Sequence, residues 1–188
     1  SFQLYEKVND RQGKFKTSIA LAEVYYRQTN YRQALQALQQ AESLPVDRKQ
    51  QGRLLTVKGL IYLETGEYQQ ALFTLQQAES SQIEDIERSN RIRLGLGEAY
   101  RYLGSYPKSL SYLETAIRVV TDAGDRGRAL NAMGEVYFEL GEFDKALDFY
   151  DRALRQRQGN GDRLRAIRTL NNLGQVYRQT GKSTEAIA

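Results

Sequence analysis

The sequence predicts an all-α fold, a solenoid built from five helical hairpins, and three observations lead to this prediction. First, only two prolines occur in 188 residues, which leaves long uninterrupted segments for helix. Second, apolar residues recur with the period of an amphipathic helix, as in Leu130, Met133, Val136, Tyr137 and Leu140. Third, the whole pattern repeats at intervals of 37, 38, 37 and 40 residues, which is typical of solenoid arrays.

Each copy is defined by columns of small residues. The first column, in the first helix of each copy, is Ala22, Gly59, Gly97, Gly134 and Gly174. Three positions later every copy has tyrosine: Tyr25, Tyr62, Tyr100, Tyr137 and Tyr177. Twelve positions after the first column stands a second small one: Ala34, Ala71, Ser109, Ala146 and Ala186. Nineteen positions after the first column, four copies have alanine: Ala41, Ala78, Ala116 and Ala153. Because small side chains let helices approach closely, these columns predict a helix A packed against a helix B.

Aspartate and glycine mark the helix ends. Aspartate stands twelve positions before the first small column in every copy, at Asp10, Asp47, Asp85, Asp122 and Asp162. A side-chain carboxylate accepts hydrogen bonds from the free N–H groups of a helix start, so we expect five N-caps. Glycine-containing turns separate helices A and B in four copies, and in the first copy Asn30 is expected to take the left-handed conformation. The copies differ in length only between the last alanine column and the next aspartate. This distance is 6, 7, 6 and 9 residues in the successive copies.

These landmarks divide the chain into a short first segment and five copies. Residues 1–9 are expected to be the tail of a preceding helix B. The copies cover residues 10–46, 47–84, 85–121, 122–161 and 162–188, the last with an incomplete helix B. Solenoids need polar caps at their ends, and neither end has one. We therefore expect a fragment of a longer protein, with self-association through the uncapped ends as an additional option.

The composition excludes several kinds of catalytic and metal site. The chain has no cysteine and no histidine, so a histidine-activated nucleophile and the usual zinc ligand sets are absent. We therefore predict no enzyme activity, no cofactor and no metal. No apolar run is long enough to span a membrane, and a cytoplasmic location is the default. The net charge of +4 is spread along the chain, which permits an acidic partner without requiring nucleic acid.

The columns resemble the tetratricopeptide repeat family, most clearly between Gly134 and Ala153. This segment contains the small-x-x-Tyr of helix A, the turn Gly141-Glu142-Phe143, and Ala146-Leu147 of helix B. The resemblance covers about residues 10–188 and implies a right-handed α-solenoid that serves as a protein–protein interaction scaffold. In place of the family's tryptophan near the start of helix A, the copies have Ser18, Leu55, Arg93, Leu130 and Leu170. The long repeats are similar to those of kinesin light chains, Pins-type scaffolds and bacterial signalling regulators.

The resemblance also implies that a partner binds in the concave groove lined by helix A. With the first small column counted as position 8, the groove positions are 2, 5, 6, 9, 12 and 13. Position 2 is basic in all five copies, which is the most suggestive feature of this surface. The candidate peptide-binding residues are Lys16, Ile19, Tyr26, Arg53, Leu60, Leu63, Arg91, Leu94, Arg101, Tyr102, Arg128, Asn131, Phe138, Arg168, Asn171, Asn172 and Arg178. The asparagines among them are similar to those of kinesin-light-chain repeats, which hold a peptide main chain.

Two interpretations of the basic column stay open at this level. In the first, the groove holds a peptide or helix of a partner protein, whose carboxylates bind the arginines and whose apolar side chains anchor it. In the second, each arginine pairs with a glutamate on the neighbouring helix and has a structural role. For the protein, we predict a scaffold that forms the regulatory or sensor arm of a larger protein. The alternative is a nucleic-acid-associated helical repeat that binds through the arginine column, and the interleaved glutamates argue against it.

Overall fold

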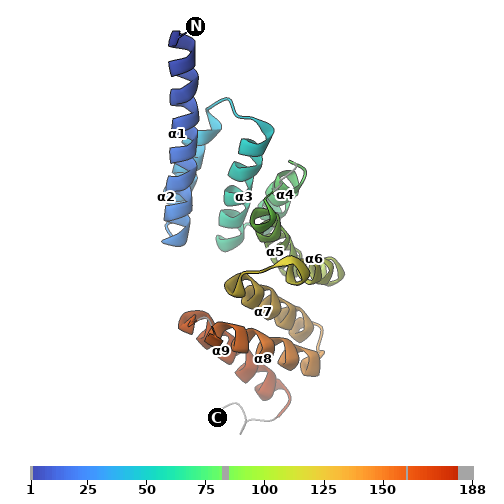
Figure 1. Ribbon diagram of the computed structural model, residues 1–188. Helices are drawn as coiled ribbons and strands as arrows, with labels where there is room; N and C mark the ends of the chain where they lie inside the picture. Colours follow the sequence, from blue (N-terminus) through green and yellow to red (C-terminus); the bar gives the residue numbers. More distant parts are fainter. Residues whose placement is uncertain (1, 82–84, 160, 182–188) are drawn as a thin grey trace. The chain divides into compact units, whose positions relative to one another are not determined.

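The computed structural model describes residues 2–81, 85–159 and 161–181 of the chain. These residues form α-helices joined by short connections, without any β-strand among them (Figure 1). The helices are α1 (Phe2–Arg27), α2 (Tyr31–Glu42), α3 (Arg48–Glu64), α4 (Tyr68–Glu79), α5 (Ile86–Tyr102), α6 (Tyr106–Val119), α7 (Ala123–Glu139), α8 (Phe143–Gly159) and α9 (Arg163–Gln179). The predicted all-α repeat fold is confirmed.

The chain divides into two compact units, Ser1–Gly95 and Leu96–Ala188, with the boundary inside α5. In unit 1, α1 packs against α2 and α3 against α4, which gives the hairpins of copies 1 and 2. In unit 2, α7 packs against α8 in the hairpin of copy 4, and α8 packs against α9. Contacts of α1 with α3 and of α7 with α9 place consecutive A helices side by side within each unit.

The small columns mark the points where helices A and B meet. A Cβ atom placed on Gly59 would lie 2.6 Å from Cγ of Leu75, and one on Gly97 would lie 2.7 Å from Cγ of Leu113. Both distances are below any normal carbon–carbon contact, so glycine is needed for the large side chain 16 positions later to reach the backbone of helix A. The second small column is fully buried in the four copies whose residue is described.

Four of the five predicted aspartate N-caps are present. The side-chain oxygens of Asp47, Asp85, Asp122 and Asp162 each accept a hydrogen bond from the backbone N–H three residues later. The N-cap predicted at Asp10 is wrong, because α1 runs without a break from Phe2 to Arg27. Asp10 instead forms an ion pair with Lys14 at 2.8 Å. Residues 2–9 thus belong to the same helix as the rest of copy 1 and do not end a separate one.

The turns between helices A and B use a left-handed residue seven positions after the small column. Gly66, Gly104 and Gly141 have φ angles of 84°, 73° and 75°. In copy 1 the left-handed residue is Thr29, with φ 59°, while Asn30 has φ −89°. The expectation for Asn30 is therefore wrong by one residue. Ala186 and the incomplete helix B of copy 5 lie outside the described residues.

Candidate functional site

The candidate site is the surface formed by positions 2, 5, 6, 9, 12 and 13 of the A helices, which we call the helix-A face. In unit 1 it lies on α1, α3 and the first part of α5. In unit 2 it lies on the rest of α5, on α7 and on α9. Adjacent A helices pack together within each unit, so side chains of successive copies can reach one another across this face.

Two arginines of the basic column are ion-paired to the preceding copy. In unit 1, Nη2 of Arg53 lies 3.3 Å from both carboxylate oxygens of Glu23. In unit 2, Nε and Nη2 of Arg128 donate to the two oxygens of Glu98 at 2.6 and 2.5 Å. Each pair joins position 2 of one copy to position 9 of the copy before it, 30 residues earlier. For these two arginines the structure supports the structural interpretation.

The other residues of the basic column are not paired with a glutamate at position 9 of the preceding copy. Lys16 is exposed and belongs to the first copy. Arg91 is half-buried, and position 9 of the copy before it is Leu60 instead of a glutamate. Arg168 is exposed, and the glutamate at the corresponding place, Glu135, binds Arg101. Within the residues that the structure describes, neither Arg91 nor Arg168 has an ion-pair partner.

Arg101 is the centre of a second set of contacts between copies 3 and 4. Its guanidinium lies 3.0 Å from Glu135 and 2.7 Å from Glu139, and it stacks over the ring of Tyr102. Its side chain is only 7% exposed. Burial alone would lower the pKa of Arg101, but the carboxylates of Glu135 and Glu139 outweigh it and raise the pKa. Arg101 is therefore held in place as a permanent cation and is not open to a partner.

Tyr26 makes the corresponding contact between copies 1 and 2. Its hydroxyl donates to Glu64 at 3.4 Å, from position 12 of one copy to position 13 of the next. The Arg101–Glu139 contact has the same spacing of 38 residues. The position-12 residues of copies 1 and 3 thus link neighbouring A helices.

Most of the apolar candidates are core residues. Ile19, Leu60, Leu63 and Leu94 are between 0% and 5% exposed, so they stabilise the packing of the hairpins and offer no surface to a partner. Phe138 is half-buried and packs against Phe143, with the ring centroids 5.8 Å apart. Among the apolar candidates, Tyr102 has the largest accessible surface, at 42%.

Asn131 is buried in a hydrogen-bond network between α7, α8 and α9. Its Nδ2 donates to Glu135 at 2.8 Å, and its Oδ1 accepts from Thr169 at 3.1 Å and from Asn172 at 3.4 Å. Oδ1 also accepts from Nη1 of Arg157 at 3.3 Å. Asn131 is therefore occupied by its own protein, while Asn172 is half-buried at the edge of the network.

Arg157, at the end of α8, is a residue that the sequence analysis missed. It is 3% exposed and donates to the backbone oxygen of Arg165 at 2.6 Å and to the hydroxyl of Thr169. No carboxylate among the described residues forms an ion pair with it, and burial lowers its pKa to about 10. It is still cationic at pH 7. The signal in the sequence was Gly127, whose missing side chain leaves room for the Arg157 stem.

On α9, the helix-A face has a set of four unengaged polar side chains. These residues are exposed, form no hydrogen bond or ion pair within the described part of the chain, and follow one another at intervals of three and four residues. Such spacing places them on one face of the helix. We call them the α9 stripe: Arg168, Asn171, Gln175 and Arg178.

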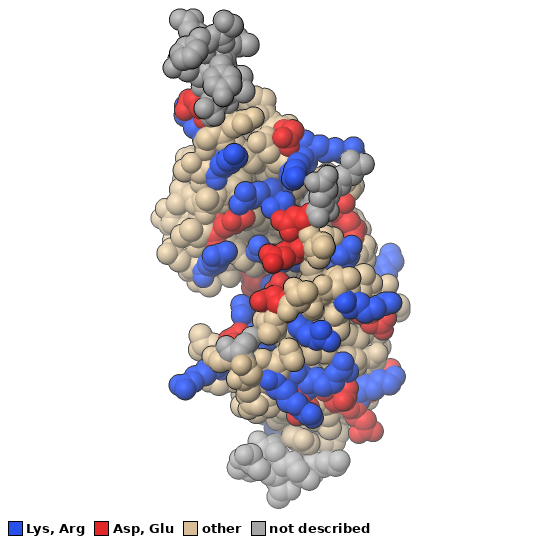
Figure 2. All heavy atoms as spheres, in the orientation of Figure 1, with Lys and Arg blue, Asp and Glu red and all other residues tan. Residues whose placement is uncertain are grey.

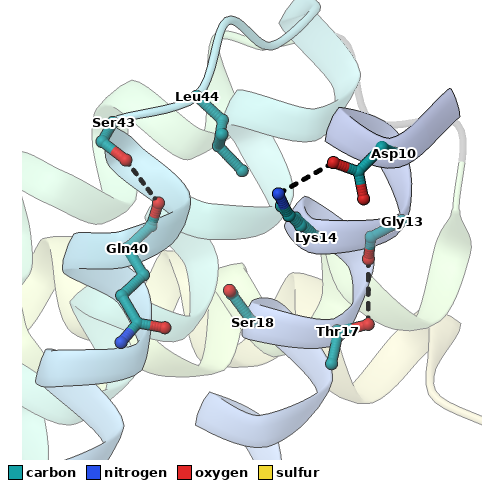
Figure 3. A pocket seen from close by; sticks show the side chains of 8 residues that line it. All are labelled: Asp10, Gly13, Lys14, Thr17, Ser18, Gln40, Ser43 and Leu44. Carbon is teal, nitrogen blue, oxygen red and sulfur yellow. Dashed lines mark hydrogen bonds and ion pairs between the residues drawn. The ribbon is translucent and has the colours of Figure 1, made fainter. Parts of the chain in front are cut away.

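An open cavity of about 970 Å³ lies between α1 and α2 (Figure 3). Ser18 lies on its wall, at the position where three other copies have leucine, and the small side chain helps to explain the open space. The polar groups around it are largely satisfied by one another, because Lys14 pairs with Asp10 and the hydroxyl of Thr17 donates to the backbone of Gly13. This cavity offers no unengaged buried group for a ligand.

The surface charges are mixed. Figure 2 shows Lys and Arg side chains interleaved with Asp and Glu over the face in view, without a continuous basic stripe. Electrostatic binding to nucleic acid uses a concentrated basic patch. The charges on the face in view therefore give no support to the nucleic-acid alternative.

The fold and the helix-A face define a class of protein, the helical-repeat scaffolds for protein–protein interaction. Sequence profiles described as tetratricopeptide repeat match residues 19–82, 88–158 and 125–188. The chain belongs to the tetratricopeptide repeat family. No curated protein is similar enough in sequence to count as a match.

Solved structures share the fold at low sequence identity. A Rap protein complexed with Competence and Sporulation Factor has a TM-score of 0.81 at 16% identity, over 93% of this chain and 51% of that one. PilF of Pseudomonas aeruginosa has a TM-score of 0.68 at 16% identity, over 94% and 73%. PH0952 of Pyrococcus horikoshii, a signal transduction ATPase with a tetratricopeptide repeat sensor, has a TM-score of 0.71 at 19% identity, over 90% and 28%. The chain thus spans about half the length of the Rap protein.

Two further properties of the described residues bear on the kind of site. None of the described helices combines the length and the apolar character needed to cross a membrane. Among the described residues, no cluster of three or more acidic side chains is arranged to hold a metal ion.

Proposed function

We propose that the protein binds a segment of a partner protein along the α9 stripe, with acidic residues of the segment on Arg168 and Arg178. The observation that carries this proposal is that these two arginines are exposed and form no ion pair with any described carboxylate, whereas Arg53, Arg101 and Arg128 are already ion-paired. A guanidinium is well suited to bind a carboxylate with two parallel hydrogen bonds.

Asn171 and Gln175 lie between the two arginines on the same helix face. A side-chain amide both donates and accepts, so it can hydrogen-bond to the main chain of a peptide whatever its sequence. The arginines therefore select acidic residues, and the amides hold the chain between them. Phe138 on α7 and Tyr102 on α5 provide partly exposed aromatic surface on the same face of unit 2 for an apolar anchor.

The spacing of the arginines sets the spacing of the acidic residues. Arg178 follows Arg168 by ten positions on α9, a rise along the helix of about 15 Å. An extended peptide advances about 3.3 Å per residue. The two acidic residues of an extended partner segment are therefore expected about four or five positions apart.

A series of synthetic peptides tests this proposal directly. Each peptide carries two glutamates separated by two, four, five or eight positions on the same Ala/Ser background, with one tyrosine as anchor and a fluorescent label. We expect the tightest binding, measured by anisotropy, at a separation of four or five. The Arg168→Glu/Arg178→Glu variant should bind this peptide about tenfold or more weakly.

The matched control changes the net charge equally at two other exposed arginines, Arg11→Glu/Arg126→Glu. This variant should keep the affinity and the spacing preference. Equal weakening in both variants, or binding that ignores the spacing, would show general charge attraction and would contradict the proposed site.

A regulatory role for this binding is part of the same proposal. Its support is analogy of fold with the Rap protein solved in complex with Competence and Sporulation Factor and with the sensor repeats of PH0952. In this role, occupation of the α9 stripe reports the presence of the partner to other segments of a larger protein.

A further inference from the structure

In copies 3 and 4, the residue of the tyrosine column is covered by a second aromatic ring from the same copy. The rings of Tyr100 and Tyr112 stack with centroids 5.6 Å apart and planes 22° apart. The rings of Tyr137 and Phe149 stack at 5.3 Å and 12°. In both copies the second ring comes from helix B, twelve residues after the tyrosine. Offset stacking of this kind is a preferred arrangement of aromatic pairs.

A lysine accompanies each of these stacked pairs. Nζ of Lys108 lies 5.4 Å from the centroid of Tyr100, and Nζ of Lys145 lies 5.1 Å from that of Tyr137. An ammonium group is attracted to the electron-rich face of an aromatic ring. The tyrosine, the second ring and the cation form one repeated unit of structure in copies 3 and 4.

Copy 2 has the tyrosine but lacks the second ring, and the cation near its tyrosine comes from α3 instead of helix B. Twelve residues after Tyr62 stands Thr74, whose side chain cannot cover the ring of a tyrosine. Nζ of Lys58 lies 6.0 Å from the Tyr62 centroid. An open cavity of about 420 Å³ lies between α3 and α4 at this place, with Tyr62, Lys58 and Thr74 among the residues that line it. Its size falls in the range of pockets that hold small ligands, about 300–1,000 Å³.

The apolar wall of the cavity includes a residue, Phe73, that has no apolar counterpart in copies 1, 3 and 4. Phe73 lines it and is 63% exposed, and Leu55 lines it from α3. At the position of Phe73, copies 1, 3 and 4 have Gln36, Ser111 and Asp148. Lys58, which also binds Glu42 at 2.6 Å, is the one charged residue in the lining, and the remaining polar groups are Thr74 and glutamine side chains. The lining thus offers a ring to stack on, apolar walls, and a cation suited to the negative face of a second ring.

We propose that the cavity between α3 and α4 binds an aromatic side chain of a partner protein, whose ring stacks on Tyr62 in the place that Tyr112 and Phe149 take in their own copies. The argument is one of internal comparison together with electrostatic complementarity. The same tyrosine is covered by the chain's own ring in two copies, and in copy 2 the space is present without that ring. An electron-rich ring suits it best, because Lys58 lies beside the stacking position. The site lies in unit 1 and is independent of the α9 stripe.

The absence of tryptophan from the chain permits a direct binding measurement. N-acetyl-tryptophanamide is the probe, and its selectively excited indole emission is followed during titration with the protein. We expect a saturable shift to shorter wavelength, as the indole leaves water, and weak binding appropriate to a single side chain. N-acetyl-leucinamide, added as a competitor, should displace the probe poorly.

Three substitutions locate the binding. Thr74→Phe supplies the missing ring from within, so the probe should bind about tenfold or more weakly, as the chain's own ring competes at high effective concentration. Thr74→Val removes the hydroxyl but adds no ring, so this variant should bind the probe within about twofold of the original protein. Phe73→Ser removes an exposed wall without touching the core and should weaken binding about threefold or more.

Circular dichroism checks that each variant is folded, and nuclear magnetic resonance of the tyrosine rings gives the position. The signals of Tyr62 should shift with the probe, while those of Tyr100 and Tyr137 should not. If Thr74→Phe does not fold, the affinity of Phe73→Ser for the probe and the shifts of the Tyr62 signals test the proposal. The proposal is overturned if no saturable binding occurs, if the leucine amide competes equally well, or if a folded Thr74→Phe or Phe73→Ser protein binds as the original does.

Discussion

The ring of Tyr150 lies directly against the backbone of Gly134, so closely that a Cβ atom on Gly134 would be 2.6 Å from Cδ1 of the ring. The two residues are 16 positions apart, on α7 and α8, and Tyr150 is 2% exposed. The distance between the two helices of this hairpin is therefore set by the absence of a side chain on one of them.

This contact predicts the cost of a larger residue. Gly134→Leu should lower the free energy of unfolding by roughly 1–3 kcal/mol or more, because the added side chain must displace Tyr150. Urea denaturation measures the change. Gly13→Ala is the control, since nothing lies within 4 Å of a Cβ at Gly13. That variant should be neutral or more stable by up to about 1 kcal/mol. An unchanged midpoint for Gly134→Leu would contradict the role of the small column.

The turn of copy 1 predicts a stabilising substitution. Thr29 has φ 59°, a conformation that a residue with a Cβ adopts at a cost of roughly 1–2 kcal/mol. Thr29→Gly should therefore raise the stability by roughly 0.5–1 kcal/mol, after the larger loss of backbone entropy on folding. Thermal unfolding checks this. Asn30→Gly should not stabilise, and a gain there instead of at residue 29 would contradict the described turn.

Because Asp47 caps a helix and Asp10 does not, replacing each with alanine should change the stability by different amounts. Asp47 accepts the backbone N–H of Gln50 at 2.7 Å and takes part in a capping box. Asp47→Ala should cost about 0.5–2 kcal/mol. Asp10 lies inside α1 in an exposed ion pair, so Asp10→Ala should change the stability by no more than about 0.5 kcal/mol. Equal costs at both positions would mean that a helix starts at Asp10 after all.

The pair of Arg128 and Glu98 predicts measurable coupling. Both side chains are at most 26% exposed and meet through two parallel hydrogen bonds. A double-mutant cycle with Arg128→Ala and Glu98→Ala should give a coupling of about 1 kcal/mol or more. The more exposed pair of Arg53 and Glu23 should give about 0.2–1 kcal/mol. No coupling in either cycle would remove the structural explanation of the basic column.

Replacing Arg157 should lower the stability of the protein even when the positive charge is kept. Arg157→Lys cannot reproduce the donors directed at Asn131, Thr169 and the backbone of Arg165. We expect a loss of about 1–3 kcal/mol, because buried acceptors are left without partners. Chemical denaturation gives the value. If the lysine variant is as stable as the original, the network does not depend on the geometry of the guanidinium.

The sequence was most informative about contacts inside one hairpin. The pairing of Gly134 with Tyr150 and the cap at Asp47 depend on residues close in the chain, so they appear as columns with fixed spacing. The turn of copy 1 was misassigned by one residue because asparagine is usually the better left-handed residue, whereas the spacing from Ala22 points to Thr29.

Contacts between copies were harder to predict. Position 2 is basic in every copy. Whether an arginine there is ion-paired depends on which basic side chain the glutamate at position 9 of the preceding copy binds. Glu135 could pair with Arg168 or with Arg101, and the structure shows Arg101. Burial of Leu60 and Leu94 and the network around Arg157 likewise depend on how neighbouring A helices pack. Periodicity in the sequence carries no such information.

The interval of 16 residues between each small residue and its large partner also determines how such a chain can be cut and rejoined during evolution. A recombination point between residues 134 and 150 separates Gly134 from Tyr150 and brings together halves that were not selected for each other. A point in the connection between Gly159 and Asp162 leaves every such pair whole, and the contacts between copies are exchanged. Copies can therefore be gained or lost as complete modules at these connections, which are also where the length of the repeat varies.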